Sequence, residues 1–176
     1  MTCPSLLSVG ILLSMLTCSP AAGQVAGVPR AWLGVWKMNL QRSTFDERAP
    51  VVVQEQALTI EATSEALILT AETTLRDGRR VSEAANLAPN GEATIGPGGV
   101  ATVFKATDSS SFDVIVSLTS PAAGELMGLN RFVFSADGRS LVETKTQTRR
   151  ESLAGGQGLP PAADTVRFVL VFERQE

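Results

Sequence analysis

The sequence contains no histidine, no tyrosine and only two cysteines, Cys3 and Cys18. These three residue types supply most ligands of zinc and transition metals and most acid–base or nucleophilic groups of enzymes. The acidic residues lack the Asp-x-Asp and EF-hand spacings of calcium sites. We therefore expect no catalytic residue, no metal site and no cofactor, with a Ser–Lys pair or a carboxylate dyad as the formal exceptions.

An excess of positive charge is also lacking. Lys and Arg number 15 against 18 Asp and Glu, a net charge of -3. Basic residues occur in isolated pairs, Arg79-Arg80 and Arg149-Arg150, whereas a nucleic-acid surface needs a basic stripe. The segment Gly96–Gly99 resembles a phosphate loop, but no Gly-Lys-Ser/Thr follows it. This pattern excludes nucleic acid as a partner.

Charge is absent altogether from the first 24 residues, which include an apolar run, Leu6–Leu16. The run is shorter than the roughly 20 apolar residues of a membrane-spanning helix, and small residues, Ser19–Gly23, follow it. We interpret residues 1–23 as a signal peptide cleaved after Ala22 or Gly23. The mature chain would then be periplasmic or secreted and have no transmembrane span, and retention of the segment as an anchor is the alternative.

Both cysteines fall inside this segment, so the mature chain would contain no disulfide. Cleavage before Cys18 and lipidation of its thiol would instead give a lipid-anchored form. The remaining chain divides into a lead-in over residues 24–31 and one domain over residues 32–176. Its length is that of a single ordinary domain, rich enough in apolar residues to build a core.

Alternation with period two dominates the domain and indicates strands rather than helices. Between Gln56 and Thr63, and again between Ala66 and Leu75, apolar and polar residues alternate, with Ser64-Glu65 as a hairpin link. Asp77-Gly78 and Asp137-Gly138 are further hairpin turns. The same pattern predicts strands at Arg80–Leu87, Val100–Thr107, Phe112–Leu118, Gly128–Ser135, Leu141–Arg149 and Thr165–Arg174, and a short strand before Gly96–Gly99. A Gly- and Pro-rich loop, 154–161, precedes the last strand.

Evenly spaced strands joined by tight turns predict an all-β domain, an antiparallel up-and-down sheet of about eight or nine strands. Closure of such a sheet into a barrel removes both exposed edges. A barrel of about eight strands is filled by side chains or is just wide enough for one small ligand. The sequence thus leaves these two interiors open.

The segment Trp32–Phe45, WLGVWKMNLQRSTF, resembles the opening strand of bacterial lipocalin-like domain proteins, calycin-type small β-barrels. The resemblance extends through the Asp-Gly turns to the closing Val171–Gln175, and so covers nearly all of the mature chain. It implies that Trp36, after Gly34, closes one end of the barrel and that Arg174 packs across its indole. A helix after the last strand, a cross-linking disulfide and a mid-chain Thr-Asp-Tyr motif are absent.

The resemblance implies a carrier that binds a small apolar ligand inside the barrel. The candidate lining residues are apolar side chains expected to face inward: Phe104, Phe112, Val114, Val116, Phe132, Phe168 and Phe172. The alternative is a solid-core barrel that acts without a ligand, as an envelope protein-interaction or homodimerising module. In that case Val169 and Val171, on the other face of the last strand, meet a neighbouring chain or the folded-back loop.

Three charged residues on predicted strands need an assigned face. Arg131 shares a face with Leu129 and Val133; because Phe132 and Phe134 on the opposite face suit a core, we expect Arg131 to point outward rather than to bind a carboxylate in a cavity. Glu143 and Lys145 lie two residues apart on one face, and such pairs are typical of a solvated sheet face. We therefore expect no catalytic role for them.

Overall fold

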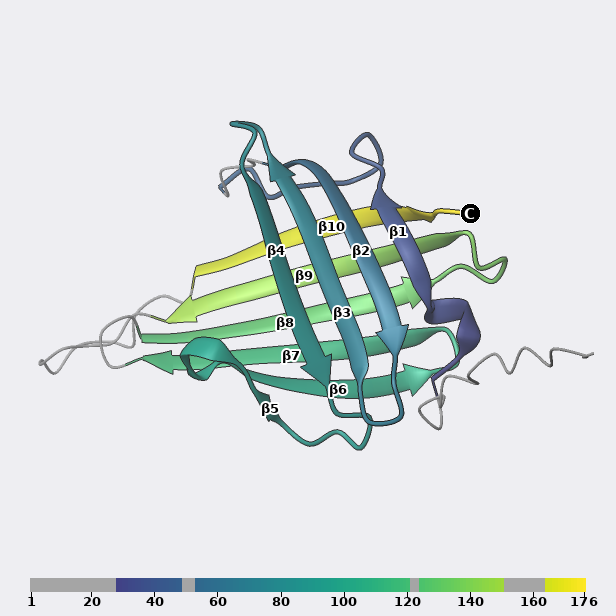
Figure 1. Ribbon diagram of the computed structural model, residues 1–176. Coiled ribbons are helices and arrows are strands. Elements are labelled where there is room, and N and C mark those ends of the chain that lie inside the picture. The colour runs from purple at the N-terminus through teal and green to yellow at the C-terminus, as the bar shows by residue number, and fades with distance from the viewer. Residues whose placement is uncertain (1–27, 49–52, 121–123, 151–163) are drawn as a thin grey trace, which may run out of the picture.

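The computed structural model describes residues 28–48, 53–120, 124–150 and 164–176 (Figure 1). The expected signal peptide, with both cysteines, and the 154–161 loop lie outside these ranges. The described residues form two short 3-10 helices, η1 (Arg30–Trp32) and η2 (Pro97–Gly99), and ten strands. The strands are β1 (Gly34–Met38), β2 (Val53–Ala62), β3 (Leu67–Leu75), β4 (Arg80–Leu87), β5 (Thr94–Ile95), β6 (Ala101–Asp108), β7 (Ser111–Ser120), β8 (Gly124–Phe134), β9 (Ser140–Arg150) and β10 (Asp164–Arg174).

The strands form one antiparallel sheet in the order β4-β3-β2-β1-β10-β9-β8-β7-β6-β5. Except for β4 and β5, which form the two edges, strands consecutive in sequence lie side by side, and β1 pairs with β10. Figure 1 shows the sheet curled so that β1 to β4 lie over β6 to β10 and cross them. The result is a nearly closed barrel, which confirms the predicted all-β, up-and-down architecture.

The number of strands agrees with the prediction. Nine of the ten strands are long, which is the upper number expected, and the tenth, the two-residue β5, lies where a short strand was expected before Gly96. The Asp77-Gly78 turn joins β3 to β4, and the Asp137-Gly138 turn joins β8 to β9. The turn chemistry of the sequence thus set the register of these hairpins.

Alternation also places the two faces of β8 as expected. Phe132 and Phe134 are buried, whereas Arg131 is exposed on the outer face. Its guanidinium donates from Nε and Nη2 to the two carboxylate oxygens of Asp113, at 2.8 and 2.9 Å. This bidentate contact holds the pKa of Asp113 below its ordinary value. The outward orientation of Arg131 is confirmed.

The edge of β10 that extends beyond β1 is paired with the chain itself. The segment after β1 runs along β10, where Thr44 and Val169 exchange backbone hydrogen bonds and the amide of Asn39 donates to the carbonyl of Val171. Val171 is buried and Val169 is half-buried. These two valines therefore offer a second copy of the chain less surface than their spacing suggested.

Candidate functional site

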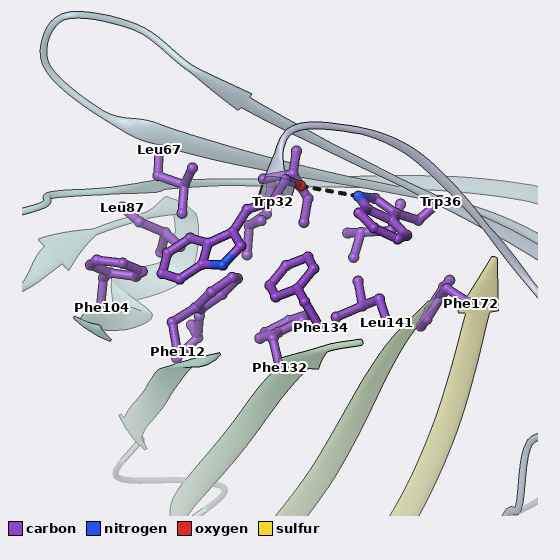
Figure 2. Packing of buried hydrophobic residues seen from close by; sticks show 14 of the residues in the cluster. Trp32, Trp36, Leu67, Leu87, Phe104, Phe112, Phe132, Phe134, Leu141 and Phe172 are labelled. Carbon is purple, nitrogen blue, oxygen red and sulfur yellow. Dashed lines mark hydrogen bonds between the residues drawn. The ribbon is translucent and has the colours of Figure 1, made fainter. Parts of the chain in front are cut away.

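One end of the barrel interior is filled by aromatic rings (Figure 2). Phe112 lies at the centre of this cluster: its ring centroid is 4.5 Å from that of Phe132 and 4.9 Å from that of Trp32. Trp32 also stacks on Phe134 at 5.5 Å, and Phe134 meets the edge of Trp36 at 5.4 Å. Rings at these separations contribute stability beyond the area they bury.

Both indole N–H groups of this packed end have partners. The Nε1 atom of Trp36 donates to the carbonyl of Trp32 at 3.1 Å, the dashed line in Figure 2. The Nε1 atom of Trp32 donates to the carbonyl of Ser109 at 3.2 Å. Trp32 belongs to η1, so this short helix covers the end of the barrel and no buried indole donor is left unsatisfied.

Arg174 lies across the same end of the barrel. Its guanidinium carbon is 5.2 Å from the centroid of the Trp36 ring, while Nη1 and Nη2 donate to the carbonyls of Ala31 and Leu33. Gly34 suits this arrangement through its backbone: its φ is +129°, which L side chains rarely adopt, while a Cβ there would lie 3.4 Å from Nη2 of Arg174, an ordinary contact distance. The structure thus places together the three residues, Gly34, Trp36 and Arg174, that the resemblance assigned to barrel closure.

The other part of the interior is hollow, a cavity of about 740 Å³. Most of its inward-facing wall consists of small and branched apolar side chains. These side chains, together with the ring of Phe132, are Leu58, Leu69, Ala71, Ala85, Val114 and Val116. A volume of this size lies within the range of small-molecule sites, roughly 300 to 1,000 Å³.

The cavity opens where the barrel is incomplete. Strands β4 and β5 are the two edges of the sheet, and the cavity is bordered by consecutive residues of both: 82–86 of β4 and 94–97 around β5. Successive side chains of β4 point to opposite faces, so its run of consecutive bordering residues places the opening along that edge; Gly96 and Pro97 follow β5 and are not strand residues. Access is therefore lateral, between β4 and the β5–β6 hairpin.

Polar side chains also line the cavity, and those deepest on the β2, β8 and β9 walls are Gln56, Asn130, Glu143 and Lys145. Lys145 lies directly across from Asn130 on β8 and from Phe168 on β10. Glu143, one inward position nearer the packed end, lies between Phe132 and Leu170. The polar groups therefore sit between the aromatic rings and the hollow part of the barrel.

Glu143 and Lys145 form an ion pair within the barrel, with 3.5 Å between Nζ and Oε1. The Glu143 side chain is 4% exposed and that of Lys145 26%. Burial raises the pKa of the Glu143 carboxyl, and the Lys145 ammonium opposes that rise. The expectation of a solvated face for this pair is wrong, because the face shared with the fully buried Leu141 points inward.

The seven expected lining residues divide among three places. Val114, Val116 and Phe132 line the cavity. Phe104, Phe112 and Phe172 lie instead in the packed core, each less than 4% exposed. Phe168 is half-buried, and its ring meets the edge of Phe45 at 6.3 Å. The structure thus brings the phenylalanines together mainly as core, while valines and alanines surround the cavity.

Sequence reasoning missed the polar lining residues, although the alternation rule contained a signal for two of them. Asn130 has the same parity on its strand as Phe132 and Phe134, and Gln56 the same parity as Leu58. Residues at even spacing on a strand share one face, so both amides had to point inward once the phenylalanines and the leucine did.

Within the described ranges, no helical segment has the length and apolar character of a membrane span. In the same ranges, no group of three or more His, Cys, Asp or Glu side chains is arranged to hold a metal ion.

No known family model matches the chain, and neither does any curated protein sequence. Solved structures do match it, among them the structure of EF1p2_mFAP2b bound to DFHBI. That chain is 11% identical, and the match covers 88% of this chain and 100% of that one with a TM-score of 0.44. A likeness at this identity and score identifies neither a family nor a ligand.

Proposed function

We propose that the protein binds a small, mainly apolar molecule in the hollow part of its barrel. The observation that carries this proposal is the cavity of about 740 Å³, walled by apolar side chains and open between β4 and β5. Burial of apolar ligand surface against such walls contributes roughly 25 cal/mol per Å². Polar groups at a few places, here Asn130 and the Glu143–Lys145 pair, then orient the ligand.

The cavity also favours a ligand carrier over the alternative, a solid-core barrel that acts without a ligand. A barrel that acts only through its outer surface, as an interaction or homodimerising module, needs no hollow interior and gains stability from filling it. The described residues fill only one end. We therefore favour the carrier, and propose binding rather than catalysis because Glu143 and Lys145 pair with each other and the chain has no His or Tyr.

Binding is tested with a fluorescent apolar probe and two matched variants. Val116→Phe places a ring in the cavity, whereas Val133→Phe adds the same ring to the outer face, where Val133 is 41% exposed. We expect the probe to bind the unmodified protein and Val133→Phe, and to bind Val116→Phe at least about tenfold more weakly. Absence of probe binding to the unmodified protein, or equal weakening by both variants, would refute the proposal.

We further propose that the carrier is lipocalin-like and acts outside the cytoplasm. The support is the Gly34-Val35-Trp36 element with Arg174, and the uncharged N-terminal segment with its apolar run. Intact-mass measurement of the protein from a bacterial envelope fraction tests export. A mass beginning at Gly23 or Gln24 supports a cleaved signal, a diacylglyceryl mass on Cys18 supports the lipidated form, and a full-length mass contradicts both.

A further inference from the structure

The cavity carries a charge asymmetry that the proposed apolar ligand does not use. In the described part of the chain, three charged side chains line the cavity: Glu83, Glu143 and Lys145. Glu83 is exposed on the edge strand β4, at the mouth of the cavity, whereas Glu143 and Lys145 lie inside the barrel. The polar chemistry available to the inner end of a ligand therefore depends on which member of this pair faces the cavity.

The register of the strand pairs indicates which of Glu143 and Lys145 faces the cavity. Glu143 occupies the inner position, between Phe132 and Leu170, and its side chain is almost fully covered. Lys145 occupies the next position outward and has several times the exposed fraction of Glu143. The cation therefore faces the hollow part of the barrel, and the anion lies behind it.

Lys145 is the one cation among the cavity-lining residues of the described part of the chain. An ammonium has three N–H donors, of which the Glu143 carboxylate at 3.5 Å takes one. Asn130, directly across the strand pair, and Gln56, on the opposite wall, add side-chain amides, each of which can donate or accept a hydrogen bond. The two remaining donors of the ammonium favour an anionic acceptor, and the amides can adapt to one.

We propose that the cavity selects amphiphiles with a carboxylate head, which the Lys145 ammonium binds while the apolar body lies against the Val114, Val116 and Leu69 walls. This inference rests on the proposed function and names the chemistry of its ligand. Glu143 is a positioning residue here, because it holds the ammonium from behind and does not itself face the ligand. Fatty acids and other apolar carboxylic acids share this chemistry.

The probes are dodecanoate, dodecanol and dodecylammonium, which share one chain and differ in head group. Titration calorimetry below their micelle concentrations measures the three affinities. We expect dodecanoate to bind about 10- to 100-fold more tightly than dodecanol, the effect of a charge-assisted hydrogen bond, and dodecylammonium most weakly.

Variants at the pair identify the recognising group. Lys145→Met should abolish the preference for dodecanoate and leave dodecanol affinity in place, whereas Lys105→Met, on the exposed outer face of β6, should change neither. Glu143→Gln should strengthen dodecanoate binding, since it removes a competing carboxylate. The double variant Glu143→Gln/Lys145→Met leaves no unpaired buried charge, so it retains the test if Lys145→Met does not fold.

The outcomes distinguish the two proposals. Equal affinity for dodecanoate and dodecanol overturns the carboxylate inference and leaves the apolar carrier intact. Tightest binding of dodecylammonium, lost in Glu143→Gln, also overturns it, because the carboxyl would then be the recognising group. Failure of all three probes to bind overturns the proposed function as well.

Discussion

The two ends of the barrel interior follow the same strand alternation yet differ in what fills them. At one end inward positions carry Trp36, Phe112 and Phe134, whose rings meet one another (Figure 2). At the other end the corresponding positions carry small side chains, as where Gly128 faces Val116 across β7 and β8. Side-chain size at inward positions, rather than strand geometry, therefore decides which part of a small barrel is core and which is cavity.

Because of this difference, we expect the packed end to contribute mainly to the stability of the fold and the hollow end mainly to ligand binding. Complete burial and close ring contacts concentrate apolar stabilisation at the packed end, whereas the hollow end forgoes such contacts and keeps room for a ligand. Substitutions at the packed end should therefore alter mainly the free energy of unfolding. Substitutions at the hollow end should alter mainly ligand affinity.

The largest effect is expected at Trp36, which is fully buried. Trp36→Ala should lower the free energy of unfolding by about 3 to 5 kcal/mol, because the lost ring leaves a cavity among well-packed neighbours. Urea unfolding followed by circular dichroism measures this loss. A loss below about 1 kcal/mol would show that the packed end does not anchor the fold.

A pH-dependent effect is expected from Glu143 at the boundary of the two ends. Burial raises its folded-state pKa, so the folded protein holds this proton more tightly than the unfolded chain. The associated stability is present below the ordinary pKa of glutamate and is lost as pH rises through the raised value, at no more than about 1.4 kcal/mol per pH unit. Glu143→Gln should remove this decline.

Urea midpoints of both proteins across acidic to neutral pH check that expectation. The Arg131–Asp113 pair on the outer face provides an internal reference with the opposite pH dependence. Arg131 lowers the pKa of Asp113, so the stability that this pair contributes is lost on acidification below the ordinary pKa of aspartate. Parallel pH profiles of the unmodified protein and Glu143→Gln would mean that Glu143 is not desolvated in solution.

A smaller effect is expected at Arg174. Arg174→Met keeps an unbranched apolar stem but removes the guanidinium over Trp36 and its hydrogen bonds to Ala31 and Leu33. We expect a loss of about 1 to 2 kcal/mol in unfolding free energy. Arg139→Met, an exposed arginine in the neighbouring turn, is the control and should cost less than about 0.5 kcal/mol.

The smallest change in stability is expected at Val116. Val116→Ala removes two methyl groups from a wall that already borders the cavity, so the unfolding free energy should fall by less than about 1 kcal/mol. The affinity for an apolar probe should fall as well, because wall contacts are lost. A stability loss as large as that of Trp36→Ala would erase the proposed division between the two ends.

Sequence reasoning predicted the strands because alternation and turn chemistry are local. Phe132 and Phe134 identified the inner face of β8 and thereby the outward Arg131. The burial of Trp32 could not be predicted in this way, because the 3-10 turn that carries it has no alternation to follow. Trp32 is 1% exposed only because η1 folds across the end of the barrel.

The candidate site was less predictable because the face of β9 was assigned by charge. A Glu–Lys pair two residues apart is usually solvated, and nothing local distinguishes this pair from others. Leu141, on the same face, was the one indication to the contrary. Which phenylalanines line a cavity and which fill the core depends on how far each lies from the barrel end, a property of closure and shear rather than of any one strand.

The sequence by itself determined the β class, the turns and the alternation of faces, since these follow from backbone geometry over a few residues. It also brought small residues such as Ala71 and Ala85 to inward positions. Only the tertiary structure decided that these positions meet around one cavity, that Trp32 covers the opposite end, and that Lys145 faces the hollow while Glu143 lies behind it. Those relations join residues distant in sequence, and only closure of the sheet brings them within contact.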